Sequence, residues 1–326
     1  MRLLYMSSPS LTQGCDVAPM AIKLSCIPQS YGGYLRNMMD EQMSRMLDWA
    51  LEEDLGSGDC TSNSSVPPSM VEEGFILAKE PGVIAGVEVA REVFKRVDPM
   101  VSFESLMNDG DAVKEGDVVI RIQGNARSIL AAERLALNFM QRMSGVATTT
   151  RRAMDLLEGT PTKILDTRKT TPGLRAFEKL GVRLGGGVNH RMGLFDMILI
   201  KDNHVDYAGS MRSALAGVQD YFEKGEPRVP VVVEVRSISE LKEALDASQT
   251  EGLRLERLLL DNFTPTQIRE AVTVVAGRLP LEASGGIDLS NLRAYGEAGV
   301  DFVSMGALTH SVKSLDLSLK TKPFLT

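Results

Sequence analysis

The second half of the chain alternates short apolar runs with stretches of helical periodicity. Apolar runs of strand length and composition occur at 163–166, 188–190, 196–200, 230–235, 256–261, 280–284 and 301–305. Between several of them, apolar positions recur at helical spacing over 208–224, 239–248, 265–276 and 289–298. This alternation is typical of a parallel sheet with right-handed crossovers. The spacing of these runs favours closure into a barrel over an open sheet.

The first half of the chain has a different pattern, which predicts a mixed domain. Residues 40–54 carry apolar side chains at helical spacing, and residues 126–157 form a longer helical pattern. We expect a break in the longer helix at Ser144 and Gly145. The region from about 72 to 124 is rich in predicted strands. Its elements are a strand at 73–78, a helix at 87–97 and two short strands within 109–119.

Composition is that of an ordinary soluble protein, and it argues against several classes of partner. Hydrophobic residues make up 43% of the chain and charged residues 24%. The net charge of −7 argues against a general nucleic-acid binder. The three cysteines form no CxxC motif, which argues against a zinc site or a disulfide framework and predicts a cytoplasmic location. No apolar run has the length of a transmembrane helix, so we expect no membrane partner.

Residues 1–40 have few charges and no firm period, and we expect them to be poorly ordered. They lack the apolar core of a secretory signal. Three interpretations stay open for this segment. It is an organelle transit segment, a disordered tail, or the product of a start codon placed too far upstream.

Basic side chains gather between residues 163 and 204, against the acidic background of the chain. They are Arg168, Lys169, Arg175, Lys179, Arg183, His190, Arg191 and Lys201. Lys201 directly follows the apolar run 197–200, which argues against a solvated surface helix. In a parallel barrel, the loops at the C-terminal ends of the strands build the active site. We therefore predict a cavity for an anion that carries several negative groups.

Chemically capable groups follow six of the predicted strands. In chain order they are Asp166 with Arg168 and Lys169, then Lys201, Glu234, Asp261, Ser284 with Gly285 and Gly286, and Gly306 before His310. A parallel barrel brings such strand ends to one rim. The glycines of the last two loops predict a phosphate site, because they let backbone N–H groups approach an anion closely.

Glu234 and Asp261 are carboxylates at successive strand ends. Next to a phosphate they predict a Mg²⁺ site, because Mg²⁺ prefers oxygen ligands and substrate phosphates. The alternative is an ion pair with Lys169 or Lys201. Both interpretations hold together if a lysine takes the place of the metal when the metal is absent.

These motifs together resemble a known family. The segment 166–204, DTRKTTPGLRAFEKLGVRLGGGVNHRMGLFDMILIKDNH, is followed in order by EVRS, LLLDNF, EASGGI and SMGALTH. This series resembles quinolinate phosphoribosyltransferase, also called nicotinate-nucleotide pyrophosphorylase (carboxylating). The resemblance covers about residues 45 to 320.

The resemblance implies an α/β fold with an N-terminal α/β open sandwich over 41–138 and a seven-stranded parallel α/β barrel over 139–311, as in type II phosphoribosyltransferases. Residues 312–326 then return to the first domain. It also implies a homodimer, or a higher oligomer, in which each active site is shared between two subunits.

The implied reaction joins quinolinate to 5-phosphoribosyl-1-pyrophosphate with Mg²⁺, and it releases pyrophosphate and CO₂ to leave nicotinate mononucleotide for NAD biosynthesis. By the resemblance, the two carboxylates of quinolinate are bound by Arg168, His190, Arg191, Lys201 and, from the partner subunit, Arg134. The sugar pyrophosphate is bound by Lys169, Glu234, Asp261, Ser284, Gly285, Gly286, Gly306 and His310. The catalytic set is Lys169, Lys201, Glu234 and Asp261, of which Glu234 and Asp261 hold the metal.

Three alternatives remain at this point. A related phosphoribosyltransferase could act on nicotinate or another pyridine-like acid, but the several predicted cations favour a diacid. A Schiff-base lyase on the same barrel would use Lys169 or Lys201 as its amine. A non-enzymatic carrier or scaffold built on the β-rich segment would not need six polar strand ends.

Overall fold

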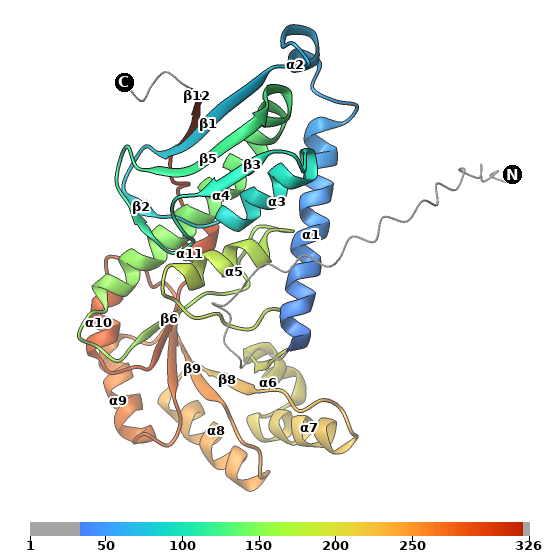
Figure 1. Ribbon diagram of the computed structural model, residues 1–326. Helices are drawn as coiled ribbons and strands as arrows, with labels where there is room; N and C mark the ends of the chain where they lie inside the picture. The colour runs from blue at the N-terminus through green and yellow to red at the C-terminus, as the bar shows by residue number, and fades with distance from the viewer. Residues whose placement is uncertain (1–32, 322–326) are drawn as a thin grey trace, which may run out of the picture.

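The structure is a computed structural model that describes residues 33–321. An antiparallel sheet with its helices forms the upper part of Figure 1, and a parallel sheet with its helices forms the lower part. The prediction for residues 1–32 lies outside the described residues. Residues 33–40 were expected to be poorly ordered, but they form the start of helix α1 (Gly33–Leu55). Met39 and Met43 of this helix are buried in the core.

The described residues of the first part form a four-stranded antiparallel sheet in the order β12-β1-β5-β3. The strands are β1 (Val71–Ala78), β3 (Ser102–Ser105), β5 (Val118–Asn125) and β12 (Leu317–Thr321). Strand β12 pairs with β1 from the far end of the chain. The short strands β2 (Gly82–Val83) and β4 (Ala112–Val113) form a separate pair.

Helices α2 (Cys60–Ser65) and α3 (Val87–Val97) flank this sheet. Helix α3 has the bounds that the apolar spacing predicts. Helix α2 was not predicted, because its residues are polar and have no apolar face. Asp59 caps the N-terminus of this helix, because its carboxylate accepts hydrogen bonds from the backbone N–H groups of Thr61 and Ser62 at 2.9 and 3.0 Å.

The long helix α4 (Ala126–Leu156) is continuous, so the predicted break at Ser144 and Gly145 was wrong. The Ser144 hydroxyl accepts the N–H of Ala85 at 2.9 Å and donates to its carbonyl oxygen at 3.1 Å. A Cβ on Gly145 would lie 2.3 Å from the carbonyl oxygen of Lys313. These small residues therefore allow close packing of two other segments against an unbroken helix. The domain boundary expected at 138/139 falls inside α4 and stays a prediction.

The described residues of the second part form a six-stranded parallel sheet in the order β6-β11-β10-β9-β8-β7. Its strands are β6 (Lys163–Leu165), β7 (Ile198–Ile200), β8 (Val231–Val235), β9 (Arg257–Asp261), β10 (Leu281–Ser284) and β11 (Phe302–Ser304). The seventh predicted strand, 188–190, is reduced in the described chain to one parallel bridge between Val188 and Leu165. Strands β6 and β7 stand at the two ends of this hydrogen-bonded order, and in Figure 1 the sheet lies beside helices α6 to α9.

The helices of this part agree with the predicted rhythm and add two elements. Helices α7 (Met211–Glu223), α8 (Ile238–Thr250), α9 (Pro265–Val275) and α10 (Leu292–Glu297) lie where the periodicity predicts them. Helices α5 (Arg175–Leu184) and α6 (Asp202–Ala208) were not predicted from the apolar spacing. A short turn, α11 (Ala307–His310), follows β11.

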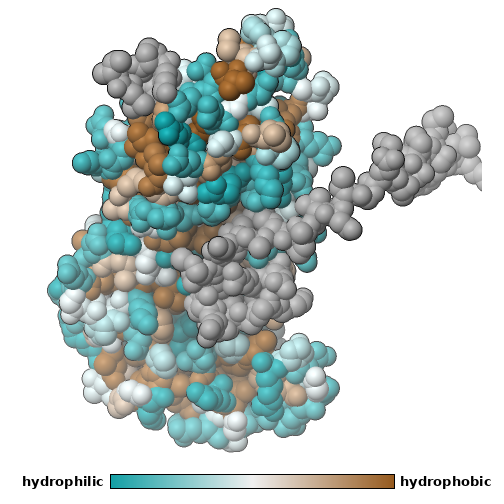
Figure 2. Space-filling view, viewed as in Figure 1, coloured by the Kyte–Doolittle hydropathy of each residue, from teal (hydrophilic) through white to brown (hydrophobic). Residues whose placement is uncertain are grey.

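Helices α4 and α5 join the two parts. Each contributes to both large clusters of buried side chains in the described residues: Met143 and Phe177 pack in the upper cluster, and Val146 and Val182 pack in the lower one. Every described helix is too short or too polar to cross a membrane. The face in Figure 2 carries both hydrophilic and apolar residues on its upper and lower parts.

A matched pair of glycine substitutions tests the packing of α4. Gly145→Ala should destabilise the protein by about 1–3 kcal/mol, because the added methyl group meets a backbone carbonyl. Gly217→Ala makes the same change in α7, where nothing lies within 4 Å, and should stabilise by up to about 1 kcal/mol. The measurement is the urea midpoint of each variant. Equal shifts for both would contradict the close approach at Gly145.

Candidate active site

A cavity of about 950 Å³ opens at the C-terminal ends of the parallel strands. It brings together every residue to which the family resemblance assigns a role in binding or catalysis, except Arg134. The predicted residues that line it are Arg168, Lys169, His190, Arg191, Lys201, Glu234, Asp261, Ser284, Gly285, Gly286, Gly306 and His310. These residues come from segments spread over more than a hundred positions of the chain, which is what parallel strands feeding one rim produce.

The strand register explains why these groups meet. In the parallel ladder, Ser284 of β10 lies beside Asp261 of β9, and the Asn262 N–H donates to the carbonyl oxygen of Ser284 at 2.8 Å. Ile200 of β7 lies beside Val233 of β8. Lys201 follows Ile200, and Glu234 follows Val233. The register therefore places these two charged side chains next to each other at the rim, where they form a hydrogen bond.

Two arginines crowd each other in this cavity. The pKa of Arg191 is lowered, first by burial and then by the neighbouring charge of Arg168, while Asp196 opposes the shift. The Arg191 guanidinium donates to the carbonyl oxygen of Met197 at 3.2 Å. The Arg168 guanidinium has no hydrogen bond or ion pair with any described residue. Such a pair of cations favours the binding of an anion.

The two predicted metal ligands are both on the rim. Glu234 is buried and accepts a hydrogen bond from Lys201 Nζ at 2.9 Å, so the predicted ion pair forms with Lys201. Asp261 accepts a bond from the Asn262 side chain at 2.8 Å. No group of three or more metal-binding side chains occurs in the described residues. Two carboxylates fit Mg²⁺ all the same, because this ion takes its other ligands from water and substrate phosphates.

Glycines shape the opposite side of the cavity. Gly285 has φ +99°, and a Cβ there would lie 2.2 Å from Asn262 Oδ1. A Cβ on Gly306 would lie 2.9 Å from Lys169 Cδ and 3.0 Å from the His310 ring. The small residue at 306 therefore lets Lys169 and His310 converge on the loop between β11 and α11. Open backbone and two basic side chains are suited to a phosphate.

Not all of the predicted basic cluster lines the cavity. Lys179 is fully buried and forms an ion pair with Asp166, which is also fully buried. Asp166 accepts the His190 N–H at 2.8 Å, and Lys179 donates to the His190 carbonyl oxygen at 3.0 Å. Arg183 also lies outside the cavity. The prediction that the whole cluster binds an anion was wrong for Lys179, whose place among the apolar residues of α5 was the available signal.

Arg142 was missed because it lies in the middle of a long helical pattern. Its guanidinium donates to buried Glu178 at 2.7 Å and to the carbonyl oxygen of Thr309 at 2.5 Å. Glu178 also accepts the backbone N–H of Thr171 at 3.0 Å. The arginine thus connects α4 and α5 with the loop that carries His310.

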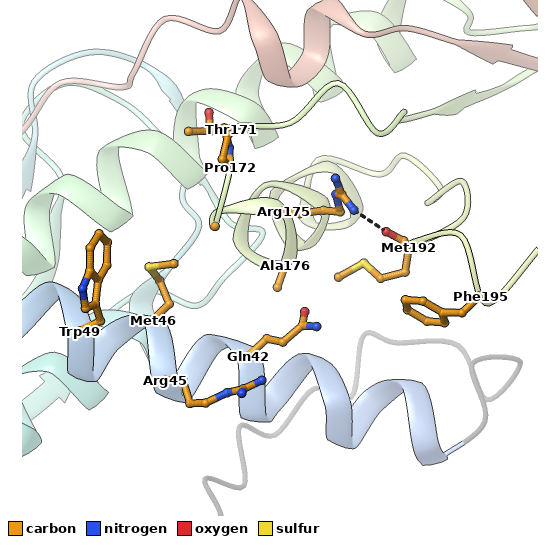
Figure 3. A pocket seen from close by; sticks show the side chains of 11 residues that line it. Gln42, Arg45, Met46, Trp49, Thr171, Pro172, Arg175, Ala176, Met192 and Phe195 are labelled. Carbon is orange, nitrogen blue, oxygen red and sulfur yellow. Dashed lines mark hydrogen bonds between the residues drawn. The ribbon is translucent and has the colours of Figure 1, made fainter. Parts of the chain in front are cut away.

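A second cavity, of about 500 Å³, lies between α1 and the start of α5 (Figure 3). Trp49 and Met46 of α1 face it on one side, and Phe195 closes it on the other. Arg175 points into this cavity and donates to the carbonyl oxygen of Met192 at 3.1 Å. Among the described residues that line it, none is a carboxylate. Arg175 is therefore separate from the cations of the large cavity, contrary to the expectation for the basic cluster.

Arg134 lies on the exposed side of α4 and does not line the large cavity of its own chain. Its neighbour Glu133 is influenced by Arg134 and by Lys320 of β12, and burial raises the pKa of that glutamate more than the two cations lower it. Arg134 is therefore part of the surface of the antiparallel sheet domain.

Comparison with known proteins agrees with this arrangement. The C-terminal domain of quinolinate phosphoribosyl transferase matches residues 146–320, and the N-terminal domain of the same family matches residues 59–144.

Individual relatives cover most of the chain. Quinolinate phosphoribosyltransferase (decarboxylating) 2b, mitochondrial, from Nicotiana tabacum is 46% identical over 85% of this chain and 82% of its own length. Nicotinate-nucleotide pyrophosphorylase (carboxylating), chloroplastic, from Arabidopsis thaliana is 42% identical over 96% of this chain and 89% of its own. The crystal structure of NadC from Streptococcus pyogenes superposes with a TM-score of 0.80 at 40% identity, over 86% of this chain and 98% of that one. The chain belongs to the quinolinate phosphoribosyltransferase family, as its motifs predicted.

Proposed function

We propose that this protein transfers the phosphoribosyl group of 5-phosphoribosyl-1-pyrophosphate to the ring nitrogen of quinolinate, with loss of pyrophosphate and CO₂, to give nicotinate mononucleotide for NAD biosynthesis. The observation that carries the proposal is the large cavity, where crowded guanidinium groups face two carboxylates and a glycine-lined loop. The names of the relatives support the same activity.

Quinolinate carries two adjacent carboxylates, and each needs charge-assisted donors. Arg168 and Arg191 supply planar two-donor groups, and Lys201 supplies an ammonium group at the same rim. Lys201 is held by Glu234 and is about half exposed, so its amine can turn toward a bound anion. The acid is thereby oriented with its ring nitrogen toward the sugar.

The sugar pyrophosphate is bound on the other side of the cavity. Lys169, His310 and the backbone of the loops at Ser284–Gly286 and Gly306 contact its phosphates. Mg²⁺, when bound by Glu234 and Asp261, supplies charge that favours departure of pyrophosphate. As the bond to pyrophosphate breaks, positive charge develops on the ribose ring, and the same carboxylates stabilise it.

Decarboxylation then needs no further base. Once the ring nitrogen carries the ribose it is cationic, and it stabilises the carbanion left on the adjacent ring carbon when CO₂ departs. A proton from water then forms the C–H bond of nicotinate mononucleotide. The cationic side chains keep the remaining carboxylate in place during this step.

The alternatives have less support. Nicotinate carries one carboxylate and would leave part of the cluster of Arg168, Arg191 and Lys201 without a partner. A Schiff-base lyase needs a desolvated lysine. Lys201 is instead ion-paired and about half exposed, and Lys169 is exposed. The cytoplasmic location stays a prediction, since the names of the plant relatives place them in the mitochondrion or the chloroplast.

The direct test of the reaction is an assay with purified protein. Incubation with quinolinate, 5-phosphoribosyl-1-pyrophosphate and Mg²⁺ should yield nicotinate mononucleotide and CO₂ in equal amounts. Removal of Mg²⁺ by EDTA should abolish turnover, because the leaving pyrophosphate loses its counter-charge. Nicotinate in place of quinolinate serves as the control. Product from nicotinate at an equal or higher rate would contradict the proposal.

We further propose that the active site is shared between two subunits of a homodimer. Arg134 lies outside the cavity of its own chain, on the exposed face of α4. In a two-fold dimer, such a residue can reach the cavity of the partner, and the contact then occurs twice.

Subunit exchange between two inactive variants tests the shared site. Arg134→Ala and Lys201→Ala should each be nearly inactive. After exchange, about half of the dimers are mixed, and in each of them one site carries both lesions while the other carries neither. About a quarter of all sites should therefore regain activity. Mass spectrometry verifies the exchange, and mixed dimers without activity would rule out the shared site.

A further inference from the structure

A buried charged group lies beneath the cations of the large cavity. Glu282 of β10 is fully buried and accepts a hydrogen bond from Arg257 Nε at 2.5 Å. The same carboxylate oxygen lies 3.5 Å from His190 Nε2. Arg257 and His190 are buried as well. Glu282 was not among the predicted site residues, although it lines the cavity.

The other ring nitrogen of His190 also has a partner within the protein. His190 Nδ1 accepts the backbone N–H of Arg191 at 2.7 Å. A nitrogen that accepts a hydrogen bond carries no proton, so the proton of a neutral ring lies on Nε2, on the side of Glu282. The imidazole therefore links the buried carboxylate to the backbone of the arginine that faces the substrate.

The charge of Glu282 is well defined. Burial raises the pKa of this carboxyl, but hydrogen bonds from His190 and Arg257 and the positive charge of Arg257 outweigh burial, so the pKa lies below its ordinary value. Glu282 is therefore ionised at neutral pH. An ionised acceptor facing Nε2 stabilises the ring form that has its proton on that nitrogen.

Arg257 is connected to the same arginine by a second route. Its Nη2 atom lies 4.0 Å from Met197 Sδ, and the carbonyl oxygen of Met197 accepts from the Arg191 guanidinium at 3.2 Å. The backbone of Arg191 and its side chain are thus held by groups that contact the Glu282–Arg257 pair.

Folding alone gives little reason for this arrangement. A buried ion pair is often no more stabilising than a well-packed apolar pair of similar volume. The second carboxylate oxygen of Glu282, Oε1, is buried and has no hydrogen-bond partner among the described residues, which adds a further desolvation penalty. The Glu282 carboxylate lines the cavity in spite of this desolvation penalty, which points to a role in the cavity.

We propose that Glu282 is a positioning residue, which fixes the His190 ring so that His190 places Arg191 for the quinolinate carboxylates. This inference rests on the proposed function. It gives His190 an indirect role, whereas the resemblance implies direct contact with the substrate. His190 acts through Nδ1 on the Arg191 backbone, and both of its ring nitrogens stay bonded to the protein when the substrate binds.

The first test observes the unsubstituted protein and uses one variant only to assign its signals. The chain has only three histidines, so a protein labelled with ¹⁵N-histidine gives a simple spectrum, and His190→Asn identifies the His190 signals. The proposal expects a ring with its proton on Nε2 and an unprotonated Nδ1, both before and after addition of quinolinate. A ring that acquires a second proton on Nδ1 when quinolinate binds would overturn it, because His190 would then donate to the acid directly.

The second test separates the two substrates kinetically. Glu282→Gln keeps the shape of the side chain and removes its charge. It should raise the KM for quinolinate and lower kcat/KM for this acid about tenfold to a hundredfold, as for a lost hydrogen bond to a charged group. The KM for 5-phosphoribosyl-1-pyrophosphate should change by less than about twofold, and the signal of protonated Nε2 should weaken.

Leu281→Val is the matched control, since it changes a buried apolar side chain next to Glu282 on the same strand. It should lower the stability of the protein and leave the KM values for quinolinate and for 5-phosphoribosyl-1-pyrophosphate unchanged. Equal effects of Glu282→Gln on the two substrates, or the same kinetic change in Leu281→Val, would overturn the proposal. If Glu282→Gln does not fold, the spectrum of the unsubstituted protein still shows whether His190 gains a second proton when quinolinate binds. An unsubstituted protein with the expected ring proton but no activity on quinolinate would instead refute the proposed function.

Discussion

The active site depends on one buried ion pair, between Asp166 at the end of β6 and Lys179 of α5. Asp166 accepts the N–H of His190, and Lys179 donates to the His190 carbonyl oxygen, so both backbone polar groups of the residue before Arg191 are bound by this ion pair. Removing one member of a buried pair leaves an uncompensated charge and typically destabilises by about 3–5 kcal/mol. The pair therefore fixes the position of the cations as well as the fold around them.

That attachment matters because the cations repel each other. Arg168 and Arg191 lie close enough for one to lower the pKa of the other, in a chain whose net charge is −7. Without a rigid support, the two guanidinium groups would move apart into solvent. Held in place, they give a positive region on one part of a cavity whose lining also includes carboxylates, and this region attracts small anions. The buried carboxylate of Glu282 balances part of this charge from below.

Much of this arrangement follows from local sequence patterns. The alternation of apolar runs and helical stretches predicted the parallel strands β6 to β11, and the polar residues after each run predicted the lining of the cavity. The reason is geometric, because parallel strands deliver their C-terminal ends to one rim whatever their separation along the chain. The apolar spacing of α3 was likewise sufficient for its bounds.

The elements that were missed depend on contacts between distant residues. Helix α2 has no apolar face and is started by the Asp59 cap. Ser144 and Gly145 suggested a break in α4, whereas they serve packing against Ala85 and Lys313. The local sequence pattern also does not show which charged side chains pair with distant residues.

The apolar neighbours of Lys179 in α5 indicate burial, but the sequence pattern does not show that its partner is Asp166, 13 positions away. Arg142 and Arg257 were overlooked for the same reason, because their partners lie far away in sequence.

The central claim is that the cavity recognises two adjacent carboxylates, and ligand binding tests it most directly. Isothermal titration calorimetry of the purified protein should give a dissociation constant for quinolinate about tenfold to a hundredfold lower than for nicotinate, since the second carboxylate adds at least one charge-assisted hydrogen bond. Equal affinities for the two acids would contradict the account, because the crowded arginines would then have no role in recognising the diacid.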